Sequence, residues 1–276
     1  MTSMLLAMVS ASNCPSDTAP SPTPQLTPEA TSTTTEAPSP TPQLTPEATP
    51  TTTEVPSSSS SSGKGSSSFA RFFDQGRFHE VFPNAVELYS FNGLVDASIK
   101  YTEFANSGND DSDKRELAAF LAQTAHESDS FKATEEYGYE GFSVWEYCRN
   151  TTYTCAPGRR YHGRGPIQIT WSYNYYNAGE APEDDLLNNP DIVASDTTVT
   201  WMTALWYWMT PQNGRVIHDV VTDESGFAQS TDIINGGLEC GPEAPNKANE
   251  EQRITYFTKM CEALGVEPLG ATSCNA

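Results

Sequence analysis

Two carboxylates stand shortly before a glycine-rich, aromatic segment in the middle of the chain. Glu127 follows His126, and Glu136 comes nine residues after Glu127. The tract 161–170, YHGRGPIQIT, combines glycine, aromatic rings and hydrogen-bonding side chains. A pair of carboxyl groups can protonate a leaving group and activate a water molecule, and such a tract can hold a sugar polymer. These residues therefore indicate hydrolysis of a glycosidic bond.

The first carboxylate is predicted at the end of a helix. Asp113, with Glu116 three positions later, is a helix-start pattern, and residues 116–127 contain no glycine or proline. Glu127 comes seven residues after Phe120, so both project on nearly the same face. An ionisable side chain in line with an apolar stripe indicates partial burial. The alternative is a solvated Glu127 at a helix end.

Three more segments are predicted to be helices: Thr197 to Met209, Phe227 to Ile234, and Lys247 to Leu264, the last closed by Gly265. The first is apolar on all sides, which indicates a central buried helix. Its tryptophans, Trp201, Trp206 and Trp208, are expected to pack in the core and not to stack on sugars. Pro166 to Thr170 is the best candidate for a short strand. The predicted fold is mainly α-helical, with long loops.

Residues 15–66 have the composition of a linker. They are rich in Ser, Thr and Pro, and an 18-residue repeat covers 19–36 and 37–54 with one difference, Ser32 against Pro50. Each repeat offers one leucine, too little apolar surface for a stacked solenoid. We expect a disordered, extended and O-glycosylated stalk, followed by one folded domain over residues 67–276.

The chain begins with a short apolar run. Residues 4–11, MLLAMVSA, resemble a secretory signal without its positive start, so residues 1–14 are interpreted as a signal remnant. A Met-rich tail is the alternative. No other run approaches the ~18 apolar residues of a membrane span. We therefore expect a secreted protein that is extracellular or associated with a cell wall.

The cysteines indicate disulfides and not a metal site. There are six: Cys14, Cys148, Cys155, Cys240, Cys261 and Cys274. Cys148 and Cys155 could close a short loop, and the last three leave one pair and one unpaired thiol. No Cys-x-x-Cys pair exists, and His126 has no partner at His-x-x-x-His spacing, so no metal is expected. Asn150, followed by two threonines, is an acceptor for N-glycosylation.

The net charge of −21 limits the partners of the chain. No basic stripe interrupts the acidic composition, so no nucleic-acid partner is expected. An acidic, soluble protein is compatible with a neutral substrate. We expect a monomer without a cofactor.

Several long tracts, in this order, resemble family 19 glycoside hydrolases, the lysozyme-like chitinases of plants and some bacteria. They are His126-Glu127, CAPGRRYHGRGPIQITWSYNYYNAG (155–179), DLLNNPDIVA (185–194), ALWYWMTPQ (204–212) and IINGGLECG (233–241). The similarity spans about residues 70 to 274. It implies a lysozyme-like, mainly α (α+β) domain. It also implies an endochitinase that hydrolyses the β-1,4 linkages of chitin or chito-oligosaccharides with inversion.

The resemblance assigns roles to the two carboxylates. Glu127 matches the general acid of the family. In plant members the base follows a Tyr-Cys pair, but no carboxylate follows Tyr147-Cys148 here. Short-loop bacterial members place the base nine residues after the acid, where this chain has Glu136. Glu135 is the alternative base, and Glu140 is a weaker candidate.

Other family positions carry over residue by residue. Thr170 matches a serine that helps to hold the nucleophilic water. Glu239 and Arg253 match a pair that supports the catalytic cleft, and Arg164 lies in the strongest motif. The positions assigned to substrate binding are His126, Gln168, Tyr173, Asn174, Gln212 and Asn235.

One segment departs from the family. Ser128-Asp129-Ser130 stands where relatives usually carry Thr-Gly-Gly, which adds Cβ atoms and a charge beside the acid. The departure could shift the pH optimum or weaken activity. Two alternatives to a chitinase follow: a chitin-binding protein with impaired catalysis, and a hydrolase of the N-acetylmuramic acid-containing glycan of bacterial walls.

Overall fold

The computed structural model describes residues 67–148 and 153–275. Helices account for nearly all regular structure there, and no strand occurs in these ranges, which confirms the mainly α-helical prediction. The α-helices are α1 (Gln75–Val81), α2 (Phe91–Ser98), α3 (Asp110–Glu127), α4 (Ser172–Ala178), α5 (Thr197–Met209), α6 (Ile217–Val220), α7 (Gly226–Glu239) and α8 (Lys247–Leu264). Four 3-10 helices are η1 (Ser68–Arg71), η2 (Glu87–Tyr89), η3 (Tyr139–Gly141) and η4 (Pro190–Ala194).

Some predictions fall on other parts of the chain. The signal remnant, the stalk and the Asn150 acceptor lie outside the described residues. Within the described residues, no helix has the length and apolar character needed to cross a membrane.

The central helix is α5, with the bounds that its apolar composition predicts. Asp196 caps it by accepting hydrogen bonds from the backbone N–H groups of Thr198 and Val199. Trp201 and Trp208 are fully buried, as expected. The ring of Phe120 from α3 lies within 6.1 Å of both indoles, centre to centre. The third tryptophan of the helix, Trp206, is half-buried against the same core.

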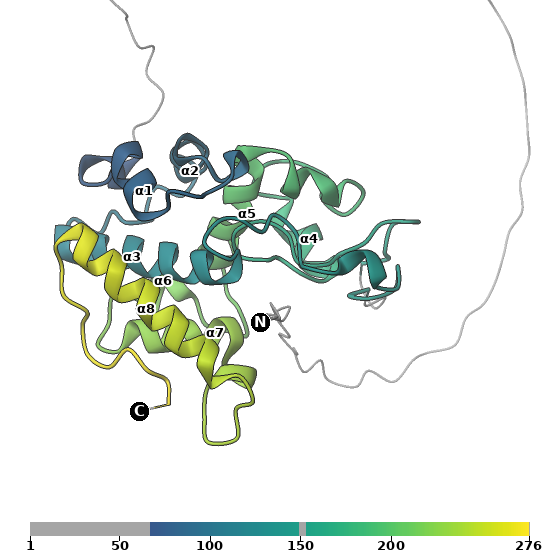
Figure 1. Cartoon of the computed structure of the whole chain (residues 1–276). Helices are drawn as coiled ribbons and strands as arrows, with labels where there is room; N and C mark the ends of the chain where they lie inside the picture. Colours follow the sequence, from purple (N-terminus) through teal and green to yellow (C-terminus); the bar gives the residue numbers. More distant parts are fainter. Residues whose placement is uncertain (1–66, 149–152, 276) are drawn as a thin grey trace, which may run out of the picture. The chain divides into compact units, whose positions relative to one another are not determined.

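Helix α3 begins earlier than predicted. Asn109 is the cap, and its side chain accepts from the backbone N–H groups of Asp111 and Ser112. Asp113, the expected start, lies inside the helix, is buried, and accepts from Ser107. The first turn is acidic, which suits the positive end of the helix dipole. It contains no apolar residues, so the apolar periodicity of the sequence does not reveal the true start of the helix. Helix α8 packs along α3 and is drawn in yellow in Figure 1.

The predicted strand Pro166–Thr170 is wrong, because the chain forms a tight turn there. The backbones of Arg164 and Ile169 pair in an isolated bridge, with N···O distances of 3.2 and 2.9 Å. Gly165 has φ 74°, and a Cβ at that position would lie 3.0 Å from Thr200 Oγ1. A positive φ and a close neighbour both require glycine at this turn.

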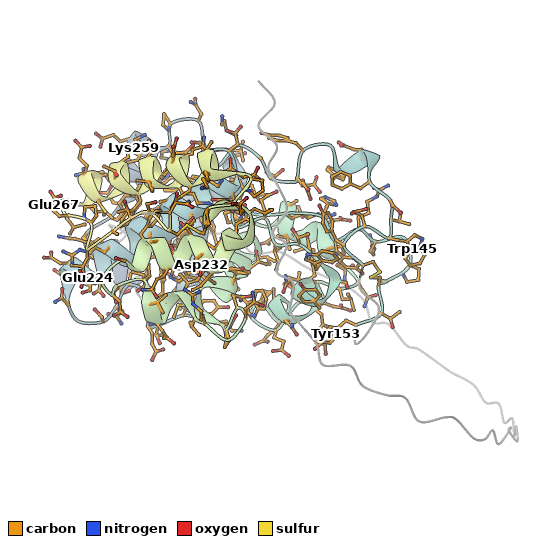
Figure 2. All side chains as sticks on the ribbon, turned by 90° about the horizontal axis from the view of Figure 1, so that it is seen from below. Trp145, Tyr153, Glu224, Asp232, Lys259 and Glu267 are labelled. Carbon is orange, nitrogen blue, oxygen red and sulfur yellow. A yellow bond between two sulfur atoms is a disulfide. The ribbon has the colours of Figure 1, made fainter. Side chains whose placement is uncertain are left out.

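Two disulfides cross-link the described residues, Cys148–Cys155 and Cys240–Cys274. The first closes the short loop that the spacing predicts, and the second settles which pair forms near the end of the domain. Cys261 is buried and forms no disulfide with another described residue. Figure 2 shows Trp145 and Tyr153, near the first disulfide, at the opposite side of the view from Glu267.

Candidate active site

Glu127 lies at the last position of α3 and is buried. Its exposed fraction is 4%, on the same side of the helix as the buried Phe120. The prediction of burial is therefore confirmed, and the alternative of a solvated carboxylate is wrong. Ser128 follows as the cap residue, and its backbone N–H bonds to the carbonyl of Thr124.

Arg253 of α8 joins Glu127 to Glu239 of α7. Its Nη2 donates to Glu127 Oε1 and, at 2.8 Å, to Glu239 Oε1, while its Nε donates to Glu239 Oε2 at 2.7 Å. Asn235 Nδ2 donates to Glu239 Oε1 at 2.7 Å. Thus one arginine is shared between two carboxylates, with two bonds to Glu239 and one to Glu127.

Gln123 completes this buried group. Its Oε1 accepts from Arg253 Nη1 at 2.8 Å, and its amide donates to the hydroxyls of Ser230 and Thr231 on α7. No sequence motif singled out Gln123. Its position four residues before Glu127, on the same helical face, is the one signal that could have identified it.

The surroundings of Glu127 favour its protonated form. Burial raises the pKa of Glu127 because a charged carboxylate is poorly solvated there, and the positive charge of Arg253 only partly opposes this effect. Glu239 raises the pKa further by repulsion. Burial and Arg253 also lower the pKa of the neighbouring His126, which favours a neutral imidazole.

Glu136 is the second buried carboxylate, with an exposed fraction of 6%. Tyr147 Oη donates to its Oε1 at 3.0 Å, and the backbone N–H of Gly163 donates to its Oε2 at 3.1 Å. Its own backbone N–H bonds to the carbonyl of Gly163 at 2.8 Å. Burial raises the pKa of Glu136. The hydrogen bonds from Tyr147 and from the backbone of Gly163 oppose this rise because they stabilise the ionised carboxylate.

Glu135, the alternative base, is engaged elsewhere. Its Oε1 accepts from His162 Nε2 and from Arg164 Nε, each at 3.0 Å. The hydrogen bond from His162 is the main reason that its pKa is lowered, and the charge of Arg164 adds to the effect. A carboxylate stabilised as an anion is a weak proton acceptor. Glu140, the other candidate, is exposed on η3.

Arg164 serves this second network. Its remaining donors reach Asp191 Oδ1 at 2.7 Å, Tyr175 Oη at 3.0 Å and the carbonyl of Arg160 at 2.9 Å. The side chain is buried. These bonds hold the loop that carries Glu135, so a supporting role for Arg164 fits the geometry.

The expected substrate-binding residues fall into separate groups. Thr170 is fully buried, and its hydroxyl donates to the carbonyl of Gln168 at 2.8 Å. Asn174 Nδ2 donates to the carbonyl of Thr170 at 2.8 Å. Gln168 Nε2 donates to the carbonyl of Gly165, while its buried Oε1 has no hydrogen-bond partner in the part of the chain that the structure describes. Tyr173 beside this group is half-buried.

Gln212 belongs to a different region. Its Nε2 lies 3.2 Å from the carbonyl of Tyr207 and from Thr210 Oγ1, at the end of α5. Asn235, by contrast, joins the Arg253 group described above. The structure therefore brings together Glu127, Glu239, Arg253 and Asn235, and it places Glu136 with Tyr147, which sequence reasoning did not select.

Comparisons with known proteins identify the family of the chain. The family model described as "Chitinase class I" (Glyco_hydro_19) matches residues 72–274. This chain belongs to glycoside hydrolase family 19. An endochitinase of Pisum sativum is 39% identical over 213 residues, which cover 68% of this chain but only 65% of that protein. Chitinase 3 of Oryza sativa subsp. japonica is 41% identical over 240 residues, 76% of this chain and 73% of that protein.

Solved structures extend the family match to the fold. Chitinase C from Streptomyces griseus HUT6037 shares 36% identity with a TM-score of 0.67, covering 73% of this chain and 96% of that chain. A bacterial family 19 chitinase shares 38% identity with a TM-score of 0.67, covering 73% and 98%. These matches confirm the lysozyme-like fold that the sequence tracts imply.

The departure from Thr-Gly-Gly coincides with a run of positive φ angles in this chain. Asp129, Ser130 and Phe131 have φ of 51°, 60° and 61°. This left-handed conformation costs a residue other than glycine about 1 kcal/mol or more. Side-chain bonds hold the turn: Ser130 Oγ lies 2.7 Å from Tyr256 Oη, and Asp129 pairs with Lys132 at 3.1 Å.

Proposed function

We propose that this chain is a secreted endochitinase that hydrolyses β-1,4-linked N-acetylglucosamine polymers with inversion. The observation that carries the proposal is the difference between its two buried carboxylates. Burial raises the pKa of both carboxyl groups. Repulsion from Glu239 raises the pKa of Glu127 further, whereas the hydrogen bonds from Tyr147 and from the backbone of Gly163 oppose the effect of burial on Glu136. Separated environments of this kind are how one site holds both an acid and a base.

Glu127 is the general acid of the proposal. Its proton passes to the glycosidic oxygen as the bond to the anomeric carbon breaks, and the carboxylate that forms accepts from Arg253. The same arginine is already bound twice by Glu239, so its charge is largely compensated before the reaction. Glu127 can therefore remain protonated until the sugar is bound, and then become an anion beside a cation.

Glu136 is the general base. It takes a proton from a water molecule that attacks the anomeric carbon from the opposite face, which inverts the configuration. Tyr147 and the backbone of Gly163 fix both oxygens of its carboxylate. Thr170 is proposed to help to hold this water through the free lone pairs of its hydroxyl.

The substrate is an uncharged polymer, which suits a chain of net charge −21. We propose that binding uses amide, hydroxyl and imidazole side chains, without metal or cofactor. The residues are His126, Gln168, Tyr173, Asn174, Gln212 and Asn235. Two disulfides support a folding compartment outside the reducing cytosol, and hence secretion.

The anomer released from a soluble chitin oligomer tests this proposal. Proton NMR should show the α-anomer first for the wild type, and little product for Glu136→Gln. First release of the β-anomer would contradict inversion. An oligomer that binds but is not cleaved would favour a chitin-binding protein with impaired catalysis. Faster turnover of bacterial wall glycan would favour a hydrolase of that glycan.

A further inference from the structure

The segment that follows α8, residues 266–275, runs along α7 from its beginning to its end, and we name it the strap. At the beginning of α7, the backbone N–H of Ser225 donates to Leu269 O and Ser225 Oγ accepts from Ala271 N, both at 3.0 Å. Gly270 lies so close that a Cβ would stand 2.6 Å from Ser225 N. At the other end, Cys274 forms the disulfide with Cys240, the residue after α7.

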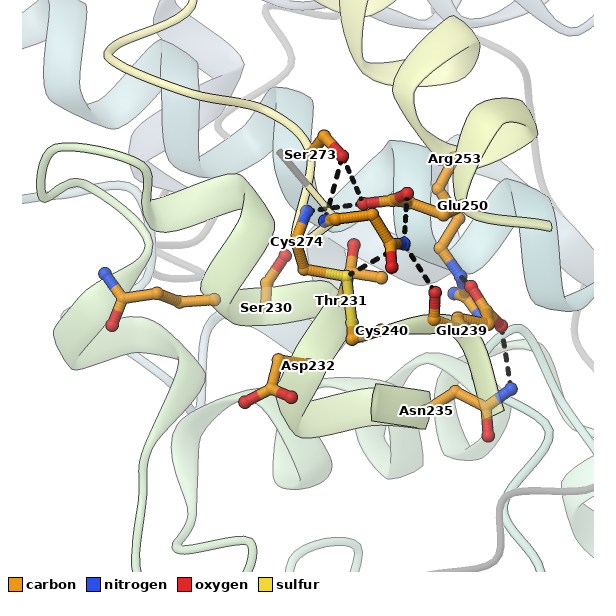
Figure 3. The surroundings of a disulfide bond; sticks show 12 residues. Ser230, Thr231, Asp232, Asn235, Glu239, Cys240, Glu250, Arg253, Ser273 and Cys274 are labelled. Carbon is orange, nitrogen blue, oxygen red and sulfur yellow. Dashed lines mark hydrogen bonds and ion pairs between the residues drawn. A yellow bond between two sulfur atoms is a disulfide. The ribbon is translucent and has the colours of Figure 1, made fainter. Parts of the chain in front are cut away.

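A buried carboxylate of α8 anchors the end of the strap. Glu250 accepts from Ser273 Oγ at 2.9 Å, from the backbone N–H of Cys274, and from Asn275 Nδ2 at 2.6 Å. Asn275 Nδ2 also donates to the backbone carbonyl of Glu239 at 2.7 Å. Figure 3 shows these bonds around the disulfide, next to the side chains of Glu239 and Arg253.

The end of α7 needs such support because the helix is broken shortly before it. Asn235 has φ −147° and ψ 30°, outside the helical region, so only four residues of α7 follow the break. Glu239 is the last of them and its carboxylate binds Arg253 twice. About one helical turn has few internal hydrogen bonds, so contacts from outside must fix its place.

We propose that the strap is a positioning device for the proton donor. Glu250 anchors the end of the strap, and from there Asn275 and the Cys240–Cys274 disulfide hold the backbone at Glu239. Glu239 in turn binds the guanidinium of Arg253, so that Arg253 stays shared between Glu239 and Glu127. The inference rests on the proposed function, because it concerns the acid of that reaction. None of the strap residues is placed in contact with the substrate.

The groups that face Glu127 predict the direction of the effect. They are Arg253 on α8, Glu239 on α7, His126 on its own helix and Tyr207 on α5. Burial favours the neutral form of both His126 and Tyr207, so Arg253 and Glu239 carry the charges. A displaced Glu239 leaves Arg253 to Glu127 alone, which stabilises the ionised acid and lowers its pKa.

The test compares kcat and KM across pH for hydrolysis of a soluble chitin oligomer. Asn275→Ala removes the bond to the Glu239 carbonyl, and C240A/C274A removes the covalent anchor. The basic limb of kcat/KM reports ionisation of the acid. We expect this limb to move to lower pH by about half a unit or more, with kcat reduced about threefold to tenfold at neutral pH and KM changed less.

Ser225→Ala is the matched control, because it removes a bond at the far end of the strap. It should leave the basic limb in place. All variants are assayed well below their melting temperatures. If the variant without the disulfide folds poorly, Asn275→Ala alone provides the test. Lower melting temperatures with an unmoved limb in both test variants would show that the strap only stabilises the fold, and would overturn the inference. A wild type without hydrolysis would overturn the proposed function as well.

Discussion

Glu135 and Glu136 are neighbours in the chain, but their carboxyl groups meet opposite environments. Glu135 accepts from His162 and Arg164, and the pKa of this carboxyl is lowered. Glu136 is buried, and its pKa is raised. The spacing from Glu127 favours Glu136 as the base, and the contacts of Glu135 supply an independent physical reason for that choice.

Removing each of these two carboxylates in turn tests the assignment of the base. Glu136→Ala should reduce hydrolysis of a chitin oligomer by about 10²- to 10⁴-fold. Added azide or formate should restore part of the rate by entering the vacated space. Glu135→Ala should cost much less, because it leaves the base in place. An inactive Glu135→Ala beside an active Glu136→Ala would assign the base to Glu135, and activity in both would point to Glu140.

Tyr147 should tune the pH at which the base becomes active. Its hydroxyl donates to Glu136 Oε1 and stabilises the ionised form, so Tyr147→Phe should raise the pKa of Glu136. The base works when it is ionised. The acidic limb of kcat/KM should therefore move to higher pH, while the basic limb stays. Tyr176→Phe, an exposed tyrosine at the surface, is the control. An unmoved acidic limb would separate Tyr147 from the base.

A histidine away from the site should make stability depend on pH. His218 Nδ1 donates to buried Glu116 at 2.6 Å, and this bond raises the pKa of His218. The contribution is complete below the unfolded pKa of histidine, about 6.5, and is lost as pH rises through the folded value. His218→Ala should lower the unfolding free energy by about 1 to 2 kcal/mol in mild acid and by less in mild alkali.

Denaturant unfolding at both pH values checks this prediction. His79→Ala is the control, since His79 is exposed on α1. A loss of stability that is equal at both pH values would mean that the charge of His218 contributes nothing and that its packing accounts for the effect.

How much could be predicted depends on whether a residue's partner is local. The bounds of α5 and α8 follow from composition and from Gly265, which ends α8 with φ 67°. No prediction covers α1 and α2, whose seven and eight residues give little periodic signal. The strand predicted over residues 166–170 is part of a turn, because Gly165 takes a positive φ and the backbones of Arg164 and Ile169 pair across it.

The residues of the candidate site also differ in whether their partners are close in the sequence. Burial of Glu127 follows from its register with Phe120 on one helix, and the structure confirms it. The bond from Arg253 links residues 126 positions apart, so no local pattern can predict it without a family resemblance. Tyr147 and Gln123 were not selected for the same reason, because each acts through a contact that only tertiary folding creates.

The stalk should be dispensable for the domain. Residues 15–66 carry almost no large apolar side chains, so they have little surface with which to dock. Deletion of residues 1–66 should leave the melting temperature and the hydrolysis of soluble oligomers nearly unchanged. A large fall in melting temperature would show that this segment packs on the domain.

The most direct test of the proposed mechanism is the rate of chitin-oligomer hydrolysis by Glu127→Gln. The amide keeps the shape of the side chain and can still accept from Arg253, but it has no proton to give. We predict a loss at or beyond the upper end of the ~10²–10⁴-fold range for acid–base groups, with oligosaccharide affinity retained. Glu262→Gln, an exposed position on α8, should be as active as the wild type. Near-normal hydrolysis by Glu127→Gln would contradict the assignment of the proton donor.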